Sequence, residues 1–283
     1  MEFEYLLEKI NKAEFENEPF SHLYIENFFK KEHFERIVSC DQIHFEESKT
    51  TVDVIKNLSE KGYNVQSFPG CTTSVHEYLQ KYNQNSFEKN RKGNPVSSYG
   101  ITFRLSQIHN EFIQRLLSFL NSQLFENCLK SKFEIKNNVD IITAVQKNLS
   151  HYEISPHPDV REKALTYLIN INKDDRSEKE DIHTHLLKFK DEYSYIYDFW
   201  EKNEDINRCW VPWDWCETVK LTKHNNSLVV FKPSNDTLHA AKMVYDHTKY
   251  QRTQLYGNLM YKQKVVKPPN YEYLLKVKKN ENL

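Results

Sequence analysis

Three side chains in this sequence have the types and spacing to hold a metal ion: His157, Asp159 and His239. On an extended segment residues i and i+2 project to the same face, so the His157 imidazole and the Asp159 carboxylate can converge on one point. Pro158 disfavours helical backbone at His157, which favours such an extended segment. The pair alone is weak, because His-X-Asp arises by chance in a chain with 12 His and 40 Asp+Glu among 283 residues.

His239 strengthens the pattern if a second strand returns it to the same place. Two histidines and one carboxylate then occupy one triangular face of a metal and leave the other face open, which is the arrangement of non-haem Fe(II) oxygenases. A rival pair, His183 and His185, lies beside a charged run and has no carboxylate at strand spacing. We therefore expect that pair to bind no metal.

Runs of β-branched and aromatic residues surround these positions and predict the strands that would bring them together. The runs are 140–146, 164–172, 227–231 and 252–261. A polar turn separates the third run from His239, and Arg252 opens the fourth, which alternates between apolar and polar residues. The predicted strands therefore carry or adjoin each candidate site residue.

In these motifs the chain resembles the Fe(II)/2-oxoglutarate-dependent oxygenases, on the prolyl 4-hydroxylase-like side. Four stretches carry the resemblance in the family's order: 19–29, 151–170, 226–239 and Arg252. The resemblance implies an α+β fold, in which a double-stranded β-helix (a jelly-roll barrel) is flanked by helices. It also implies that His157, Asp159 and His239 bind Fe(II).

The resemblance further implies a cosubstrate site and a reaction. Arg252 matches the basic residue that grips the far carboxylate of 2-oxoglutarate, a role suited to the planar guanidinium fork. Tyr152, Gln146 and Asn148 are candidates for contact with the cosubstrate or with the ligands. The implied cofactors are Fe(II), 2-oxoglutarate and O2, with ascorbate as a further candidate. The implied activity is a dioxygenase that hydroxylates its substrate and releases succinate and CO2.

Domain organisation is expected to be simple, with one oxygenase domain over 1–283. Its parts would be mainly helical support over 1–135, the jelly-roll core over 139–262, a long insertion between the metal motifs at 174–212, and a tail over 263–283. The strongest helical pattern runs from Gln107 to Phe133. The insertion is read either as a lid beside the barrel mouth or as exposed decoration.

Tryptophans gather at the end of this insertion, at positions 210, 213 and 215. We expect them to pack in the core and rim, with the alternative that one of them touches substrate. In the empty protein Arg252 is expected to point inward and to meet water, an anion or a hydroxyl such as that of Thr166 or Tyr152.

The composition limits the classes of partner and substrate that we expect. The formal net charge of −1 does not suggest binding to nucleic acid or to an anionic membrane. We therefore expect a small-molecule or peptide substrate. Five scattered cysteines, no signal-like N-terminus and no long apolar run favour a cytoplasmic protein with free thiols. The substrate is open among peptidyl proline, another protein side chain and a small metabolite, and the oligomeric state is also open.

Two other classes of function fit the same residues. The first is a metal-binding jelly-roll enzyme that does not use 2-oxoglutarate, in which Arg252 is structural. The second is a catalytically silent barrel that acts as a binding module.

Overall fold

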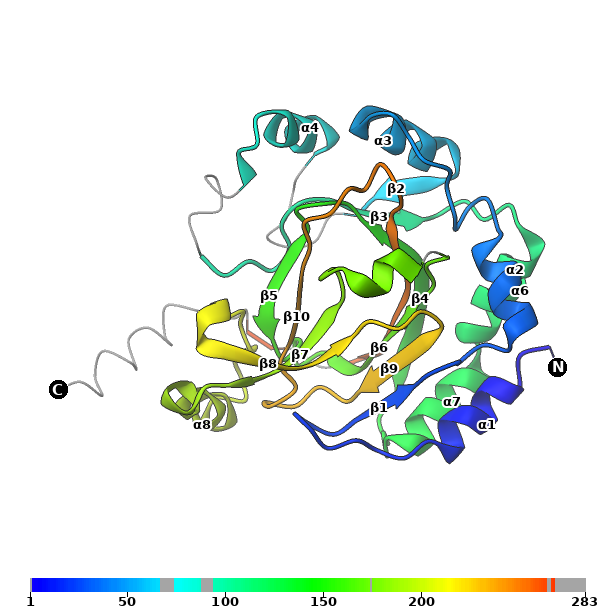
Figure 1. Ribbon diagram of the computed structural model, residues 1–283. Helices are drawn as coiled ribbons and strands as arrows, with labels where there is room; N and C mark the ends of the chain where they lie inside the picture. The colour runs from blue at the N-terminus through cyan, green and yellow to red at the C-terminus, as the bar shows by residue number, and fades with distance from the viewer. Residues whose placement is uncertain (1, 67–73, 88–93, 174, 264–265, 268–283) are drawn as a thin grey trace.

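Two sheets form the frame of the protein. The computed structural model describes residues 2–66, 74–87, 94–173, 175–263 and 266–267 (Figure 1). Within these ranges it is a mixed fold of helices and two antiparallel sheets. Most of the predicted tail, 263–283, and one cysteine, Cys71, lie outside the described residues.

The larger sheet has seven strands in the order β1-β9-β6-β11-β4-β3-β2. Their bounds in that order are His22–Ile25, Ser227–Phe231, Lys163–Asn170, Arg252–Tyr261, Val139–Asn148, Thr102–Leu105 and Tyr63–Val65. The smaller sheet has the order β5-β10-β7-β8. Its strands are Glu153–His157, His239–Lys242, Thr184–Phe189 and Cys216–Thr222.

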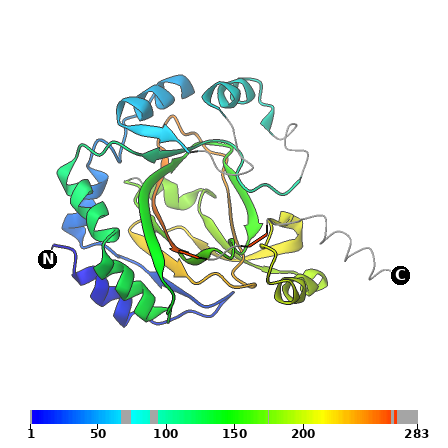
Figure 2. The ribbon, with the colours of Figure 1, turned by 180° about the vertical axis from the view of Figure 1, so that it is seen from behind.

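Seven α-helices accompany the sheets within the described residues. They are α1 Tyr5–Lys12, α2 Lys31–Val38, α3 Thr51–Glu60, α4 Val75–Asn83, α6 Glu111–Leu120, α7 Gln123–Lys132 and α8 Tyr195–Lys202. Short 3-10 turns lie at Asp175–Lys179, Asp191–Tyr193 and Trp213–Trp215. From the front and from behind, α1, α2, α6 and α7 lie on one side of the strands and α8 on the other (Figure 2). No helix in these ranges has both the length and the apolar character needed to cross a bilayer.

Strand β11 shows how one strand serves two purposes. The residues on the face toward the helices, such as Leu255 and Leu259, join the main hydrophobic core with Leu6 and Leu116. Residues of the other row, beginning with Arg252, line a cavity instead. The period-two alternation of a strand thus separates the core from the cavity.

The predicted helix from Gln107 to Phe133 is wrong as a single element, because the chain breaks between α6 and α7. Asn121 exchanges hydrogen bonds with the Thr143 main chain, donating from Nδ2 at 3.2 Å and accepting at Oδ1 at 2.7 Å. The Ser122 hydroxyl then accepts from the Phe125 amide and caps α7. Such short polar side chains compete with helix continuation, and the tie to β4 is not visible in a periodicity.

The segment 174–212 is more than an addition to the surface. It supplies β7, which pairs with β10 on one side and β8 on the other. After β7, helix α8 packs in a separate aromatic cluster that includes Trp200 and Trp215. Part of the segment expected as an insertion is therefore a strand of the smaller sheet.

Candidate metal centre

Strand pairing brings the two candidate histidines together. Strands β5 and β10 are antiparallel with His239 opposite His157, and their imidazole ring centroids are 4.3 Å apart. Asp159 lies two residues beyond β5 with φ of 60°, a left-handed conformation that Asp tolerates better than most residues. Its Oδ1 is 3.5 Å from His157 Nε2 and its Oδ2 is 3.6 Å from His239 Nε2. All three side chains are buried.

Both imidazoles are held in the same way. Nδ1 of His157 lies 2.9 Å from the Ser155 carbonyl oxygen, and Nδ1 of His239 lies 3.0 Å from the Thr237 carbonyl oxygen. A carbonyl oxygen only accepts, so each Nδ1 carries the proton and each Nε2 presents a lone pair to Asp159. This is the tautomer and orientation of metal-binding histidines.

Charge states in the cluster also suit a metal. Burial and the neighbouring His157 lower the pKa of His239 to about 3. Burial alone would raise the pKa of Asp159, but the Lys163 ammonium holds it well below its ordinary value. A metal requires neutral imidazole and ionised carboxylate, and these pKa shifts favour both forms.

The spacing fits a metal ion. Two ligands about 2.1 Å from one ion and at right angles lie about 3 Å apart. The separations of 3.5 and 3.6 Å to Asp159 exceed this by about half an ångström, which a small side-chain movement on metal binding would close. One ligand atom from each of the three residues lies within 4.8 Å of the others. No other group of three His, Cys, Asp or Glu in the described part of the chain converges in this way.

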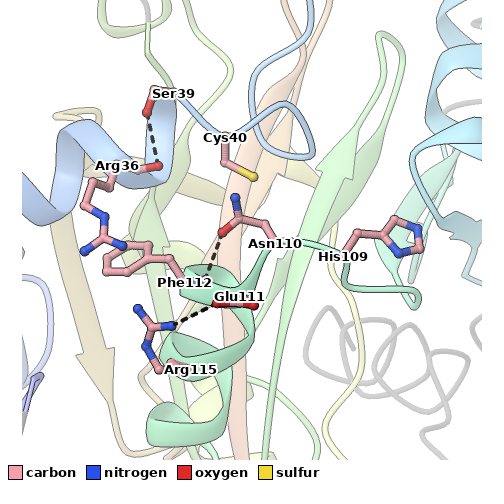
Figure 3. Close-up of a pocket in the computed structure, with 8 residues that line it drawn as sticks. All are labelled: Arg36, Ser39, Cys40, His109, Asn110, Glu111, Phe112 and Arg115. Carbon is pink, nitrogen blue, oxygen red and sulfur yellow. Dashed lines mark hydrogen bonds and ion pairs between the residues drawn. The ribbon is translucent and has the colours of Figure 1, made fainter.

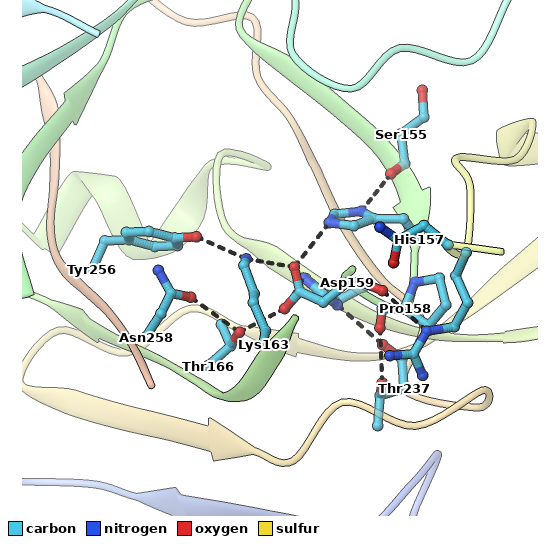
Figure 4. A network of polar contacts seen from close by, with 12 residues as sticks. Ser155, His157, Pro158, Asp159, Lys163, Thr166, Thr237, Tyr256 and Asn258 are labelled. Carbon is cyan, nitrogen blue, oxygen red and sulfur yellow. Dashed lines mark hydrogen bonds and ion pairs between the residues drawn. The ribbon is translucent and has the colours of Figure 1, made fainter. Parts of the chain in front are cut away.

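Figure 4 shows two further contacts to the carboxylate. Lys163 Nζ donates to Oδ1 at 2.6 Å and also to the Tyr256 hydroxyl at 2.9 Å, while the Thr166 hydroxyl donates to Oδ2 at 2.6 Å. A carboxylate has about four lone-pair sites, so these two bonds leave room for a metal. These two hydrogen bonds fix the orientation of the Asp159 carboxylate before a metal binds.

The cluster opens onto a cavity of about 500 Å³ between the two sheets. Both sheets contribute to its wall, together with the segment just before β8 and residues near β3. The lining that matters below comprises Arg104, Gln146, Tyr152, Lys163, Thr184, Trp210, Arg252, Gln254, Tyr256 and Asn258. The volume lies within the range of small-molecule sites, about 300–1,000 Å³.

Arg252 points into this cavity and is 2% exposed. Its Nη1 donates to Asn148 Oδ1 at 2.9 Å and its Nη2 to the Thr184 hydroxyl at 3.4 Å, while Nε has no partner among the described residues. Burial lowers the pKa of Arg252 to about 10, against an opposing effect of Tyr152 and Tyr245. A hydroxyl does meet the guanidinium, but it belongs to Thr184. The expected Thr166 instead binds Asp159, because β6 places it at the other end of the cavity.

The remaining candidates divide into two kinds. Gln146 and Tyr152 line the cavity. Asn148 is absent from its described lining and acts behind it, accepting from Arg252 and donating to the Thr102 hydroxyl at 2.8 Å. Contact between these residues and a cosubstrate stays a prediction.

The end of the 174–212 segment runs beside the ligands. Arg208 Nε donates to the Asp159 carbonyl oxygen at 3.1 Å, and the Val211 amide donates to the Pro156 carbonyl oxygen at 2.9 Å. Trp210 lines the cavity, with its ring centroid 5.9 Å from that of His157. The segment thus lies beside the site and shapes its wall.

The other tryptophans and the rival histidines do not reach the cavity wall. Trp213 donates to Glu153 at 2.7 Å, and Trp215 stacks on Tyr193. His183 bonds the Ser177 carbonyl oxygen, and His185 pairs with Asp181 at 2.9 Å. Each of these four side chains has a structural partner of its own.

A second hollow of about 490 Å³ lies far from this centre, around the start of α6 (Figure 3). Its charges are matched: Arg115 contacts Glu2 and Glu111, and Arg36 contacts Glu2. Asn110 caps the helix, so its first amides are satisfied as well. The hollow offers no convergent chemistry.

Sequence reasoning missed four residues of the centre: Arg104, Lys163, Tyr256 and Arg208. Tyr256 stands four positions after Arg252, on the same face of the alternating strand, so that periodicity could have found it. Arg104 and Arg208 come from segments whose pairing with the site is not encoded locally. Lys163 looked like an ordinary charge at the start of a strand.

Comparisons with known proteins give structural likenesses only. No family model matches the chain, and no curated protein is similar to it in sequence. A prolyl 4-hydroxylase from Pseudomonas putida is 10% identical with a TM-score of 0.37, over 76% of this chain and 100% of that one. A 2OG-Fe(II) oxygenase family oxidoreductase from Burkholderia pseudomallei is 11% identical with a TM-score of 0.36, over 81% and 98%.

A prolyl hydroxylase from Trichoplax adhaerens, solved with a peptide fragment of the hypoxia inducible factor oxygen degradation domain, is 13% identical with a TM-score of 0.32, over 78% and 96%. These structures come from the family that the sequence motifs resemble. At such identities and TM-scores they say nothing of the reaction of this chain, so the proposal below depends on the site itself.

Proposed function

We propose that the protein is an Fe(II)- and 2-oxoglutarate-dependent hydroxylase, and that its two sheets form a double-stranded β-helix. The proposal depends on one observation: a single cavity holds both the buried His157–Asp159–His239 cluster and the buried, inward-pointing Arg252. The sheet orders support the barrel, because β5 and β10 in one sheet and β6 and β11 in the other all face the same cavity. A 2-oxoglutarate molecule needs a metal at one end and a cation at the other.

Each residue has a distinct task in this proposal. His157, Asp159 and His239 hold Fe(II), which when bound supplies the activation of O2. Arg252 binds the far carboxylate of 2-oxoglutarate, with Asn148 holding the guanidinium in place. Gln146 and Tyr152 are placed to contact the cosubstrate.

Anaerobic titration tests the proposal without knowledge of the substrate. Fe(II) followed by 2-oxoglutarate should produce a weak visible charge-transfer band, which Arg252→Gln should abolish at the same cosubstrate concentration. Turnover is then measured as succinate release against a panel of peptides and small metabolites, with ascorbate present.

The other two classes of function give different results in the same titration. A metal enzyme that does not use 2-oxoglutarate would bind Fe(II) with no band. A silent binding module would contain no stoichiometric metal after purification and loading. Either outcome would overturn the proposal.

A further inference from the structure

The side chain of Arg161 joins helix α8 to the loop that carries Asp159. Arg161 is buried, and its Nε donates to the Ile206 carbonyl oxygen at 2.8 Å. Its Nη2 donates to the carbonyl oxygens of Trp200 and, at 3.4 Å, Asn203. Both lie at the C-terminal end of α8, where carbonyl oxygens lack partners within the helix and a positive charge is stabilising. Arg161 therefore caps α8 from a position two residues after Asp159.

Two residues that follow α8 hold the same loop. The Arg161 amide donates to Asn207 Oδ1 at 2.6 Å, and Asn207 Nδ2 donates to the two Glu162 carboxylate oxygens at 3.1 and 2.9 Å. Arg208 Nε donates to the Asp159 carbonyl oxygen at 3.1 Å. All of these contacts would be lost if the end of α8 moved away from the loop.

A second ligand, His239, depends on the same part of the fold. Its two neighbours in the chain, Leu238 and Ala240, belong to the aromatic cluster that includes Trp200 of α8. A core that is packed as densely as a protein interior transmits displacements of one member to the others. The docked position of α8 therefore affects two of the three ligands, Asp159 through hydrogen bonds and His239 through packing.

The docked helix also shapes the wall of the cavity. Trp210 lines the cavity, and the residues on either side of it, Cys209 and Val211, are buried in the same aromatic cluster. The Val211 amide donates to the Pro156 carbonyl oxygen at 2.9 Å, one residue before His157. The wall at Trp210 thus depends on the same docked arrangement as the ligands.

Resting on the metal site of the proposed function, we propose that metal binding and the docking of α8 are coupled. Arg161 is the positioning residue of this coupling, because it holds the loop of Asp159 against the helix. Metal binding then stabilises docked α8 and completes the cavity wall at Trp210, so that the metal binds before the prime substrate. The coupling is reciprocal: a change that loosens α8 weakens metal binding by the factor with which the metal stabilises α8.

Hydrogen exchange of the backbone amides tests the coupling in the full-length protein, with Zn(II) as the metal and no 2-oxoglutarate. If opening of α8 breaks the site, exchange in α8 should slow by about tenfold for each tenfold rise in free Zn(II) above the dissociation constant. Helix α7, on the other side of the strands, is the comparison within the same sample (Figure 2). In His157→Ala, Zn(II) should leave exchange in α8 unchanged.

Variants test the role of Arg161. Arg161→Gln should weaken Zn(II) binding by about tenfold or more, as the loss of charge-assisted hydrogen bonds implies, and should remove most of the protection of α8 by Zn(II). Arg161→Lys should recover part of both, because an ammonium can still donate to the helix carbonyls. Arg176→Gln, at an exposed arginine, should behave like wild type. Asn207→Ala cuts the second tie and should act in the same direction, which keeps the test available if Arg161→Gln does not fold.

The outcomes separate this inference from the proposed function. Exchange in α8 that ignores Zn(II), in a protein that binds one equivalent, would overturn the coupling and leave the proposed function standing. Faster exchange in α8 of Arg161→Gln with unchanged Zn(II) affinity would also overturn it, because Arg161 would then support only the helix. A protein that shows the coupling but no charge-transfer band with Fe(II) and 2-oxoglutarate loses the cosubstrate assignment alone. A wild-type protein that binds no metal contradicts both proposals.

Discussion

Arg208 Nε donates to the main-chain oxygen of Asp159 at 3.1 Å, and this bond links the end of the 174–212 segment to the proposed metal site. Asp159 has a left-handed backbone, which its neighbours must stabilise. Arg208 is 4% exposed, and burial together with the nearby Arg161 lowers its pKa to about 10. A buried cation on a carbonyl oxygen is a strong anchor for the loop that carries the carboxylate.

The first prediction follows from that anchor. Arg208→Gln should weaken Zn(II) or Ni(II) binding by about tenfold, because loss of one charge-assisted bond, about 1.5–3 kcal/mol, loosens Asp159 without removing a ligand. Calorimetric titration measures the affinity, and a melting curve of each variant checks that it is folded. Arg176→Gln, an exposed arginine of the same segment, is the control. Unchanged affinity in Arg208→Gln would show that the loop holds its shape without the anchor.

The second prediction concerns the ligands themselves. His157→Ala, Asp159→Ala and His239→Ala should each abolish stoichiometric metal binding, because two ligands remain on an open face. A wild-type protein in 100-fold excess of metal over Kd should gain about 2.7 kcal/mol of stability, and the three variants should gain almost none. The exposed His224→Ala serves as the matched control. Any of the three variants that still gains wild-type stability with metal excludes that residue as a ligand.

The third prediction separates cosubstrate from metal. Arg252→Gln should raise the apparent KM for 2-oxoglutarate by about ten- to a thousandfold, as the loss of a charge-assisted bidentate contact implies. Metal affinity should change little, because Arg252 contacts none of the three ligands in the described structure. Succinate release at varied 2-oxoglutarate gives the KM. Intact turnover at low 2-oxoglutarate in the variant would leave Arg252 with a structural task only.

The fourth prediction is a pH dependence of stability that is set by Lys147. Lys147 on β4 is fully buried on the core side, where its Nζ donates to the Thr253 hydroxyl at 2.6 Å, and burial lowers its pKa from 10.5 to about 7. Between these pH values the unfolded chain binds a proton that the folded protein does not. Stability should therefore rise with pH from about 7 toward 10, by at most about 1.4 kcal/mol per pH unit.

Urea unfolding at pH 7, 8 and 9 measures this slope. Lys147→Met should flatten it, because the substitution keeps most of the length of the side chain and removes the titrating group. The exposed Lys188→Met controls for the loss of a charge. A slope that persists in Lys147→Met would assign the pH dependence to other groups.

Local sequence was informative where geometry is local. The His-Pro-Asp motif indicated an extended segment with two polar side chains on one face. The structure shows His157 and Asp159 side by side, but β5 ends at His157 and the backbone of Asp159 is left-handed, so the extended segment does not reach the carboxylate. The features that the sequence did not predict depend on pairing between distant strands. The opposition of His239 to His157, the use of 184–189 as a strand and the place of Thr166 beside Asp159 all depend on register, which no short pattern specifies. The break at Asn121 depends in the same way on a contact with Thr143.

The two faces of β11 also limit how the sequence of this protein can evolve. Every second residue of the strand lines the cavity, from Arg252 to Met260, and Leu255 and Leu259 between them join the main core. Substitutions in the first set can alter what the cavity accepts while leaving the packed interior intact. A single inserted or deleted residue, however, would exchange the two sets at once. We therefore expect the fold to tolerate substitutions at the cavity-lining positions of β11, but not insertions or deletions within the strand.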